Sequence, residues 1–190
     1  ILGMPEAEKN NDAKFWKVID SKFGFKGNWI DLKVEKIIQP TGKEIEFEAL
    51  NYHRAGAGVV AENEQGEIIL VKSYRYISDT TAWEVPAGTV PPEQNHRDCI
   101  VEELKEEAGS IVHENDLKYI GSYYPSIGSS NQIFYCYHAK NVKQVSKDFD
   151  KNEILDVKWF SKNEIKKMIL DGEIKDGFTL SILMKVFLFC

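Results

Sequence analysis

Four carboxylates lie within six consecutive positions near the middle of the chain: Glu102, Glu103, Glu106 and Glu107, with Lys105 as the one cation among them. On a helix, side chains three and four positions apart are neighbours, so Glu103, Glu106 and Glu107 would converge on one side. Like charges at these spacings repel each other by about 0.2–0.5 kcal/mol per pair. The cluster is therefore either a solvated acidic face or a site that collects a cation.

The residue types in this cluster suit a hard divalent cation. Mg²⁺ and Mn²⁺ prefer carboxylate oxygens and retain part of their water shell. A Pro-Ala-Gly segment at 86–88 predicts a turn shortly before the cluster. A Mg²⁺ or Mn²⁺ site is thus one interpretation, and a solvated acidic face is the other.

A single helix has to position these carboxylates. Asn95 is an acceptable N-cap residue and Gly109 is a good C-terminal cap, so we expect the helix to run between them. Cys99, Ile100 and Leu104 fall on the side opposite the carboxylates, at spacings typical of an amphipathic helix. The helix should therefore pack on a core with its acidic side directed elsewhere.

Strand patterns surround this helix. Alternating or continuous apolar runs between turn residues predict strands at 15–20, 29–38, 43–52, 58–60, 67–76, 83–85, 117–124, 132–139 and 153–160. The continuous Ile-Ile-Leu-Val run within 67–76 indicates a strand buried on both faces. A capping box from Ser161 to Glu164 predicts a helix that ends at Gly172, and a last helix is expected at about 177–189.

The bulk composition limits the classes of function. The net charge of −6 provides no basic stripe, which argues against a nucleic-acid binder. Three cysteines without a CxxC pair indicate reduced thiols in a cytosolic protein. The N-terminus turns polar after four residues, so we expect no secretory signal, with Met4 as a candidate natural start. The apolar stretch at 178–190 is too short to cross a bilayer and predicts a buried terminal helix.

The stretch from 88 to 110 resembles the signature of the Nudix hydrolases, G-x5-E-x7-R-E-U-x-E-E-x-G-U, in which U is a bulky aliphatic residue. Counted from Gly88, the positions that agree in register are Glu103, Leu104, Glu106, Glu107 and Gly109. Five further segments resemble the branch that cleaves ADP-ribose and nucleoside diphosphate sugars: EVPAG at 84–88, KSYR at 72–75, YPSIGSSN at 124–131, and GNWIDL at 27–32 with PTGK at 40–43.

This resemblance implies an α+β fold, in which a mixed β-sheet is flanked by helices as an α/β/α sandwich, with a small antiparallel β arm at the N-terminus. We divide the chain accordingly into a polar tail at 1–14, the arm at 15–54 and a Nudix catalytic domain at 55–190. The arm is expected to serve in dimerisation and in stacking of a nucleobase.

The resemblance also implies a metal site and its chemistry. Glu103 and Glu107 would be the principal ligands of Mg²⁺ or Mn²⁺, with Glu106 in support and the Ala87 carbonyl as a further ligand. A pyrophosphate is polyanionic, so divalent ions must neutralise it. The expected catalytic residues are Glu103, Glu106 and Glu153.

Four residues are expected to bind substrate on the same grounds. Arg75 would contact the phosphates or the terminal ribose, and Glu84 the substrate or a second metal. Trp29 would stack the nucleobase across a dimer interface, and Gly128 belongs to a substrate loop. The alternatives are a surface ion-pair partner for Arg75 and a core residue of the arm for Trp29.

The identity of the general base is less direct. In some relatives the base follows the Ser-Asn pair of the substrate loop, but here that position is Gln132, which cannot take a proton from water. In others it is a Glu just before a late strand, and Glu153 fits that pattern. Glu153 is therefore the preferred base, and a solvated loop carboxylate is the alternative.

Two departures inside the signature change its charge, and Ser110 in place of its last aliphatic residue is a minor change. The first Glu of the signature is replaced by Gln94, although the neighbouring Glu93 could substitute, and its Arg is replaced by Glu102, which reverses a charge. In the family this Arg orients the neighbouring carboxylates by ion pairing, so its loss should loosen or overcharge the site. Arg97 or Lys105 could compensate in part.

Two functions follow from this pattern. The first is metal-dependent hydrolysis of ADP-ribose or a related nucleoside diphosphate sugar to a nucleoside monophosphate and a sugar phosphate. The second is a catalytically weakened Nudix domain that binds such a nucleotide as a sensor or non-catalytic module. Either function implies a small-molecule partner, no nucleic acid or membrane, a homodimer and a cytoplasmic location.

Overall fold

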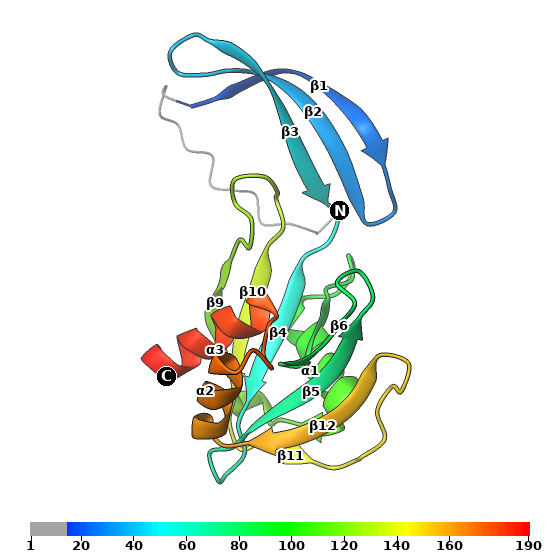
Figure 1. Ribbon diagram of the computed structural model, residues 1–190, viewed down its shortest axis with the longest axis vertical. Coiled ribbons are helices and arrows are strands. Elements are labelled where there is room, and N and C mark those ends of the chain that lie inside the picture. Colours follow the sequence, from blue (N-terminus) through cyan, green and yellow to red (C-terminus); the bar gives the residue numbers. More distant parts are fainter. Residues whose placement is uncertain (1–14) are drawn as a thin grey trace. The chain divides into compact units, whose positions relative to one another are not determined.

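The structure is a computed structural model that describes residues 15–190 (Figure 1). The polar tail predicted at 1–14 lies outside the described residues. Contacts divide the chain into two compact units. The first unit contains the described residues up to Ala55 and the segment Tyr124–Ile133. The second unit contains Gly56–Tyr123 and Phe134–Cys190. The boundary after residue 54 stays a prediction, to which the structure adds the segment Tyr124–Ile133 in the first unit.

The first unit is built on a three-stranded antiparallel sheet of β1 (Lys17–Lys26), β2 (Ile30–Ile38) and β3 (Glu44–Tyr52), in that order. The predicted N-terminal antiparallel arm is thus confirmed. β1 starts two residues later than expected and continues to Lys26, because its pairing with β2 extends past the region of clear alternation. The turn between β2 and β3 is closed by a 2.8 Å hydrogen bond from the Gly42 N–H to the Gln39 carbonyl.

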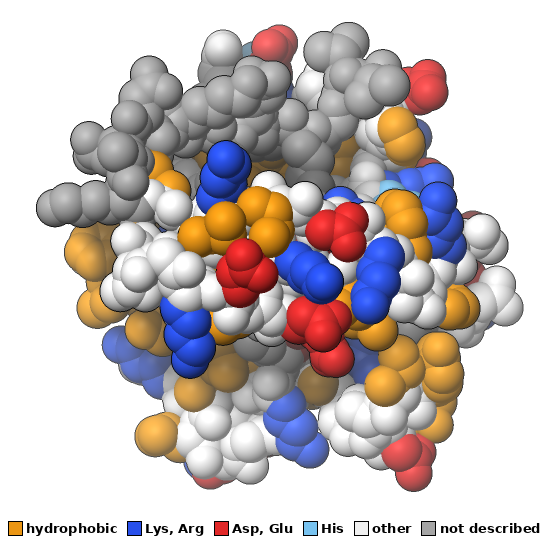
Figure 2. All heavy atoms as spheres, turned by 90° about the horizontal axis from the view of Figure 1, so that it is seen from above, with side chains coloured by type: hydrophobic (Ala, Val, Ile, Leu, Met, Phe, Trp, Pro, Cys, Tyr) orange, Lys and Arg blue, Asp and Glu red, His pale blue; other side chains and the backbone are white. Residues whose placement is uncertain are grey.

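The arm sheet leaves much apolar surface open to solvent. Every residue of β1 is exposed, and the exposed large side chains of the unit include Phe15, Trp16, Val18, Ile19, Phe23, Phe25 and Trp29. On the face drawn in Figure 2, hydrophobic side chains lie open among charged ones. Within the described part of the first unit, Ile37, Ala55 and Ile133 are the buried hydrophobic residues.

The segment Tyr124–Ile133 is tied to β3 by backbone hydrogen bonds. The Leu50 N–H donates to the Ser129 carbonyl at 2.9 Å, and the Asn131 N–H donates to the Leu50 carbonyl at 3.3 Å. The Tyr52 N–H donates to the Asn131 side-chain oxygen at 2.7 Å. These contacts explain why the segment groups with the arm.

The second unit contains three helices and the remaining strands. The helices are α1 (His96–Ala108), α2 (Lys162–Leu170) and α3 (Gly177–Phe189). A mixed sheet has the order β7-β4-β10-β9, with β4 and β10 parallel, and an antiparallel sheet has the order β12-β5-β6. The strand bounds are β4 (Gly56–Ala61), β5 (Ile68–Arg75), β6 (Thr80–Glu84), β7 (Ala87–Thr89), β9 (Leu117–Tyr123), β10 (Phe134–Ala139) and β12 (Ile154–Phe160).

Helices cover both faces of these strands, which confirms the expected α+β sandwich (Figure 1). Successive residues of a strand point to opposite faces. Val59 and Ile69 pack in the core that includes α1, whereas their neighbours Val60 and Leu70 pack in the core that includes α2 and α3. The residues of β5 from Ile68 to Val71 are almost fully buried, so the prediction of a strand buried on both faces is confirmed.

Local structure differs from the sequence-based expectations in three places. Residues 87–89 of the predicted Pro-Ala-Gly turn region form β7, because they pair with β4 at Gly58 and Gly56, and this pairing overrides their turn propensity. The two-residue strands β8 (Ser110–Ile111) and β11 (Lys143–Gln144) were not predicted, since so short a run has no periodicity. The terminal helix α3 is buried on one face only, while Leu188 and Phe189 are exposed.

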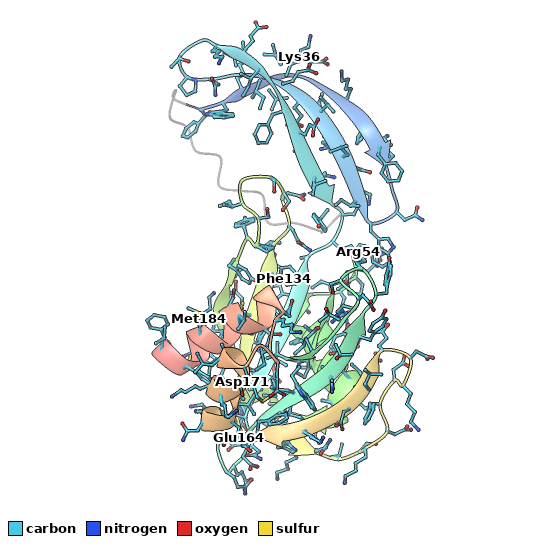
Figure 3. All side chains as sticks on the ribbon, viewed as in Figure 1. Lys36, Arg54, Phe134, Glu164, Asp171 and Met184 are labelled. Carbon is cyan, nitrogen blue, oxygen red and sulfur yellow. The ribbon has the colours of Figure 1, made fainter. Side chains whose placement is uncertain are left out.

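Glycines on β4 make room for the aromatic rings beneath α3. A β-carbon on Gly58 would lie 2.1 Å from the Phe178 ring, and one on Gly56 would lie 2.3 Å from the Phe134 ring. These two rings have centroids 4.7 Å apart, and Phe134 is labelled in Figure 3. None of the helices within residues 15–190 is long and apolar enough to cross a membrane.

Candidate active site

Local signals fix both ends of α1, as the sequence predicted. The Asn95 side chain accepts hydrogen bonds from the N–H groups of Arg97 and Asp98, both at 2.9 Å. Gly109 ends the helix in the left-handed conformation, with φ of 57°. Asn95 and Gly109 are thereby confirmed as caps, and they set the register that directs the carboxylates of the helix.

The C-terminal end of α1 is also held by the segment that leads to Glu153. The N–H groups of Val145 and Ser146 donate to the Gly109 carbonyl at 2.9 and 3.0 Å. A β-carbon on Gly109 would lie 2.2 Å from the Ser146 carbonyl oxygen. This position therefore requires glycine both for its positive φ and for the close approach of a second backbone.

Glu107 is the buried member of the acidic cluster, with 9% of its surface exposed. Its Oε2 atom accepts a 2.8 Å hydrogen bond from the Ala87 N–H. Burial raises the pKa of Glu107 to about 8, against the effect of that hydrogen bond, and repulsion from Glu103 and Glu153 adds to the rise. The structure thus brings together Ala87 and Glu107, two of the predicted metal ligands.

Glu103 is partly buried beside the backbone of Gly88. A β-carbon on Gly88 would lie 1.8 Å from the Glu103 Oε1 atom, so any side chain at 88 would displace the carboxylate. Burial raises the pKa of Glu103, and repulsion from Glu106, Glu153 and Glu102 raises it further. The steric role of the leading glycine was missed from sequence, although its fixed place in the signature was a signal.

Glu153 lies immediately before β12, at the place its sequence pattern predicted. Its N–H donates to the Asp150 carbonyl at 3.2 Å, and its side chain is exposed. The negative charge of Glu153 helps to raise the pKa values of Glu103 and Glu107, so Glu153 lies within electrostatic range of both carboxylates. Glu106 is exposed, and its negative charge raises the pKa of Glu103.

The donor chemistry of this cluster fits a hard divalent cation. Within residues 15–190, no three His, Cys, Asp or Glu side chains stand close enough to enclose a metal ion as they lie. Glu107 nevertheless offers a carboxylate oxygen beside the backbone of Ala87 and Glu103 one beside that of Gly88, and both pKa values are raised. A divalent cation would relieve that repulsion and favour the ionised carboxylates.

Arg75 and Glu84, two predicted substrate-binding residues, bind each other. The Arg75 Nε and Nη2 atoms donate to the two Glu84 oxygens at 3.1 and 2.5 Å, and Glu84 is buried. This hydrogen-bonded pair raises the pKa of Arg75, to which the charges of Glu107 and Asp176 also contribute. The pair therefore presents a fixed cation within electrostatic range of the acidic cluster.

The other two predicted substrate-binding residues, Trp29 and Gly128, belong to the first unit. Trp29 is 60% exposed, so the alternative that it is a core residue of the arm is wrong. Gly128 lies in the exposed loop of Tyr124–Ile133, which also contains Gln132.

The two positions that depart from the signature contact each other. Gln94 Nε2 donates to Glu102 Oε2 at 2.8 Å. At these positions the signature has an acceptor on the loop and a donor on the helix, whereas this chain has the donor on the loop and the acceptor on the helix. Arg97 does not compensate as expected, because its guanidinium donates to the backbone carbonyls of Glu114 and Leu117.

Comparison with known proteins identifies the family of this chain and two similar proteins. The family profile described as NUDIX domain matches residues 52–178. The chain is 28% identical over 165 residues to an ADP-ribose pyrophosphatase of Bacillus subtilis (strain 168), covering 86% of this chain and 88% of that protein. It is 25% identical over 166 residues to a methanol dehydrogenase activator of Bacillus methanolicus, with the same coverage.

A solved structure has the same fold. The chain is similar to a crystal structure of an ADP compounds hydrolase with a TM-score of 0.80, covering 94% of this chain and 95% of that chain. At 15% identity this likeness supports the α+β architecture and the presence of the arm in the same fold.

We predict that Gln94 and Glu102 act on stability as a pair. Gln94→Glu alone should lower stability, because it sets two carboxylates against each other at a contact of 2.8 Å. Adding Glu102→Arg should restore a donor–acceptor contact of reversed polarity. Urea unfolding of the four proteins in this cycle should give a coupling free energy of about 0.5–1 kcal/mol.

Glu93→Gln is the control for this cycle, since it changes the charge of the same loop next to the contact. Additive effects of Gln94→Glu and Glu102→Arg would show that the two positions are not coupled.

We predict that Glu107 makes the metal-free protein less stable as pH rises. Its pKa is about 8 in the folded protein against an ordinary 4.5, so the folded state retains a proton that the unfolded chain has lost. The stabilising contribution is complete below pH 4.5 and is lost as pH rises through 8. In EDTA, the free energy of unfolding of Glu107→Gln should rise relative to that of wild type between pH 5 and pH 8. The rise should be at most a few kcal/mol, the order of magnitude that such a pKa shift sets.

Urea unfolding at both pH values measures this difference, and parallel pH curves for wild type and Glu107→Gln would contradict it. Addition of Mn²⁺ at pH 8 should stabilise wild type more than the variant, because the cation binds the folded state through that carboxylate.

Proposed function

This chain belongs to the NUDIX domain family, and on that premise we propose that it hydrolyses the pyrophosphate of ADP-ribose or a related nucleoside diphosphate sugar. The products are a nucleoside monophosphate and a sugar phosphate. The observation that carries this proposal is the buried Glu107 carboxylate, which accepts a hydrogen bond from the Ala87 N–H. The negative charges of Glu103 and Glu153 raise its pKa further. The similarity to an ADP-ribose pyrophosphatase supports the substrate class.

Glu103 and Glu107 are the residues proposed to hold the metal, with Glu106 in support and the Ala87 carbonyl as a further ligand. When bound, Mg²⁺ or Mn²⁺ supplies positive charge that neutralises the pyrophosphate and stabilises charge that develops on its oxygens. The capped helix holds the carboxylates in place for this purpose, and Gly88 leaves the space that Glu103 occupies.

The reaction is the attack of water on one phosphorus of the pyrophosphate. A bond forms between the water oxygen and that phosphorus, and the bond from the same phosphorus to the bridging oxygen breaks, so the second phosphate leaves with the bonding electron pair. Glu153 is proposed as the general base that takes the proton of the water. Its action on the pKa values of Glu103 and Glu107 supports this role, because it lies near the proposed metal ligands.

Four residues are proposed to contact the substrate. Arg75 binds the phosphates or the terminal ribose, and its two hydrogen bonds to the buried Glu84 fix the orientation of the guanidinium. Glu84 contacts the substrate or a second metal through the same pair. Trp29 stacks the nucleobase, which its large exposed surface supports, and Gly128 lies in the loop that borders the substrate.

A second candidate is a weakened Nudix domain that binds such a nucleotide without efficient turnover. Gln132 favours it, because an amide cannot serve as the loop base. This candidate is also supported by the similarity to a methanol dehydrogenase activator, a relative whose name describes activation of another protein. The contact between Gln94 and Glu102 favours the enzyme, because it retains the link between loop and helix at the two altered positions.

The proposed setting is a cytoplasmic homodimer that acts on a small molecule. The net charge of −6 supports a substrate other than nucleic acid, since phosphate backbones require clustered cations. The free cysteines, two of them buried, support a reducing compartment.

We predict that Glu153→Gln lowers kcat by about 10²–10⁴-fold, the usual cost of losing one general base, with nucleotide affinity within a few-fold of wild type. The assay incubates protein and Mg²⁺ with ADP-ribose, UDP-glucose and GDP-mannose and separates the products by chromatography. Asp148→Asn is the matched control, because it makes the same change of acid to amide in the same segment. It should leave kcat within a few-fold.

Gln132→Glu distinguishes the two candidates. A silent Glu153→Gln with a large gain of rate in Gln132→Glu would mean that the chain lost its base at 132, and the nucleotide-binding module would then be the better description. Binding of ADP-ribose by wild type without any product would lead to the same conclusion.

We predict a homodimer formed through the arm, because the sheet of the first unit exposes apolar side chains along β1. Light scattering at micromolar concentration should give twice the chain mass. Phe25→Lys, at an exposed position of the arm, should shift the protein toward the monomer without unfolding it. A monomeric wild type at this concentration would refute the prediction.

A further inference from the structure

A hydrogen-bonded network centred on Asp31 crosses the first unit. Asp31 is 8% exposed and lies near the start of β2. Its Oδ2 atom pairs with His53 Nε2 at 2.9 Å and accepts from Asn51 Nδ2 at 3.4 Å. Its Oδ1 atom accepts from the Gly27 N–H at 3.3 Å. A buried carboxylate with this many donors is held in one orientation and in turn orients them.

On one side the network holds the turn that carries Trp29. His53 Nδ1 lies 3.2 Å from the Asn28 carbonyl oxygen, and the His53 N–H donates to the Trp29 carbonyl at 3.1 Å. Both ring nitrogens of His53 therefore face oxygen atoms, one of the Asp31 carboxylate and one of the Asn28 carbonyl. His53 and Asp31 then form a charge-assisted pair that holds residues 27–29 against β3.

Arg54 adds a contact to the ring of Trp29 itself. Its guanidinium carbon lies 4.7 Å from the centroid of the Trp29 ring, and Arg54 is labelled in Figure 3. A cation over one face of an indole leaves the opposite face for a nucleobase. With Trp29 60% exposed, the turn presents a platform whose orientation depends on its neighbours His53 and Asp31.

On the other side the network reaches the loop that contains Gly128. Asn131 Nδ2 donates to Asn51 Oδ1 at 3.3 Å and to the Tyr52 carbonyl at 3.1 Å. The same loop is closed by a hydrogen bond from the Ser129 N–H to the Ser126 carbonyl at 3.0 Å. A continuous series of contacts thus runs from the loop through Asn131, Asn51 and Asp31 to the turn of Trp29.

We propose that Asp31 is a positioning residue that couples the Trp29 turn to the loop of Gly128, so that the nucleoside half of the substrate is recognised by one preformed unit. The proposal rests on the proposed function, in which Trp29 stacks the base and the loop borders the substrate. Asp31 itself touches no reacting atom. It acts through His53 and Asn51, and the part of the substrate it serves is the nucleoside rather than the pyrophosphate.

The test follows the Trp29 ring directly by fluorine NMR. The protein is labelled with 5-fluorotryptophan, and the Trp29 resonance is identified by its loss in Trp29→Phe. In the ligand-free protein, Asp31→Asn and Asn131→Ala should each shift or broaden this resonance, because hydrogen bonds join Asn131 to the Trp29 turn through Asn51 and Asp31. Glu46→Gln, which removes an exposed ion pair with Lys22 in the same sheet, should leave it unchanged.

Titration calorimetry then measures the effect on binding. Asp31→Asn should raise the Kd for AMP and the Kd for ADP-ribose by about tenfold each, because the Trp29 turn loses the support of one charge-assisted hydrogen bond. The Kd for inorganic pyrophosphate should stay unchanged. The KM for ADP-ribose should rise by the same factor with kcat within a few-fold. Glu46→Gln should match wild type in each measurement.

An unchanged Trp29 resonance in both Asp31→Asn and Asn131→Ala would overturn the coupling, and so would an equal loss of AMP and pyrophosphate affinity. Wild type that binds neither AMP nor ADP-ribose would instead refute the proposed role of Trp29. In that case the ligand-free spectra still decide whether Asp31 couples the two segments.

Discussion

The burial of the Glu107 carboxylate against the backbone of Ala87 is the constraint on which the site depends. A carboxylate removed from water is costly unless hydrogen bonds or a counter-charge compensate it, and here one backbone N–H does so at 2.8 Å. That compensation is incomplete, because burial still raises the pKa of Glu107 to about 8. A proton or a cation would supply the remaining stabilisation, and this supports the proposed cation site over a solvated acidic face.

Close backbone approach is what allows this burial. Gly88 leaves space for Glu103 next to β7, and Gly109 admits the backbone of Ser146 at the end of α1. On the opposite face of the sheet, Gly58 admits the ring of Phe178 under α3. In each case a side chain would collide at a distance below 3 Å, so the glycines fix how near the helices and loops stand to the strands.

Local chemistry made the helix and its acidic residues predictable from sequence. Asn95 and Gly109 cap α1 through contacts within a few residues, and Ser161 with Glu164 form the expected capping box. What could not be predicted depends on partners distant in sequence. The strand β7 exists because β4 pairs with it, and the loop of Asn131 joins the arm through bonds to residues about 80 positions earlier. Periodicity carries no information about such partners.

The contact between Gln94 and Glu102 changes how the two altered signature positions should be understood. Taken separately, Gln94 is a lost charge and Glu102 a reversed one, and together they suggest a decaying site. Since they touch, one substitution makes the other tolerable, because an amide donor on the loop suits a carboxylate on the helix. The exchange is not electrically neutral, however. A Glu–Arg pair has no net charge, whereas Gln94 and Glu102 leave one more negative charge beside Glu103, whose pKa Glu102 helps to raise. The link between loop and helix is kept, and the proposed cation would have more negative charge to neutralise.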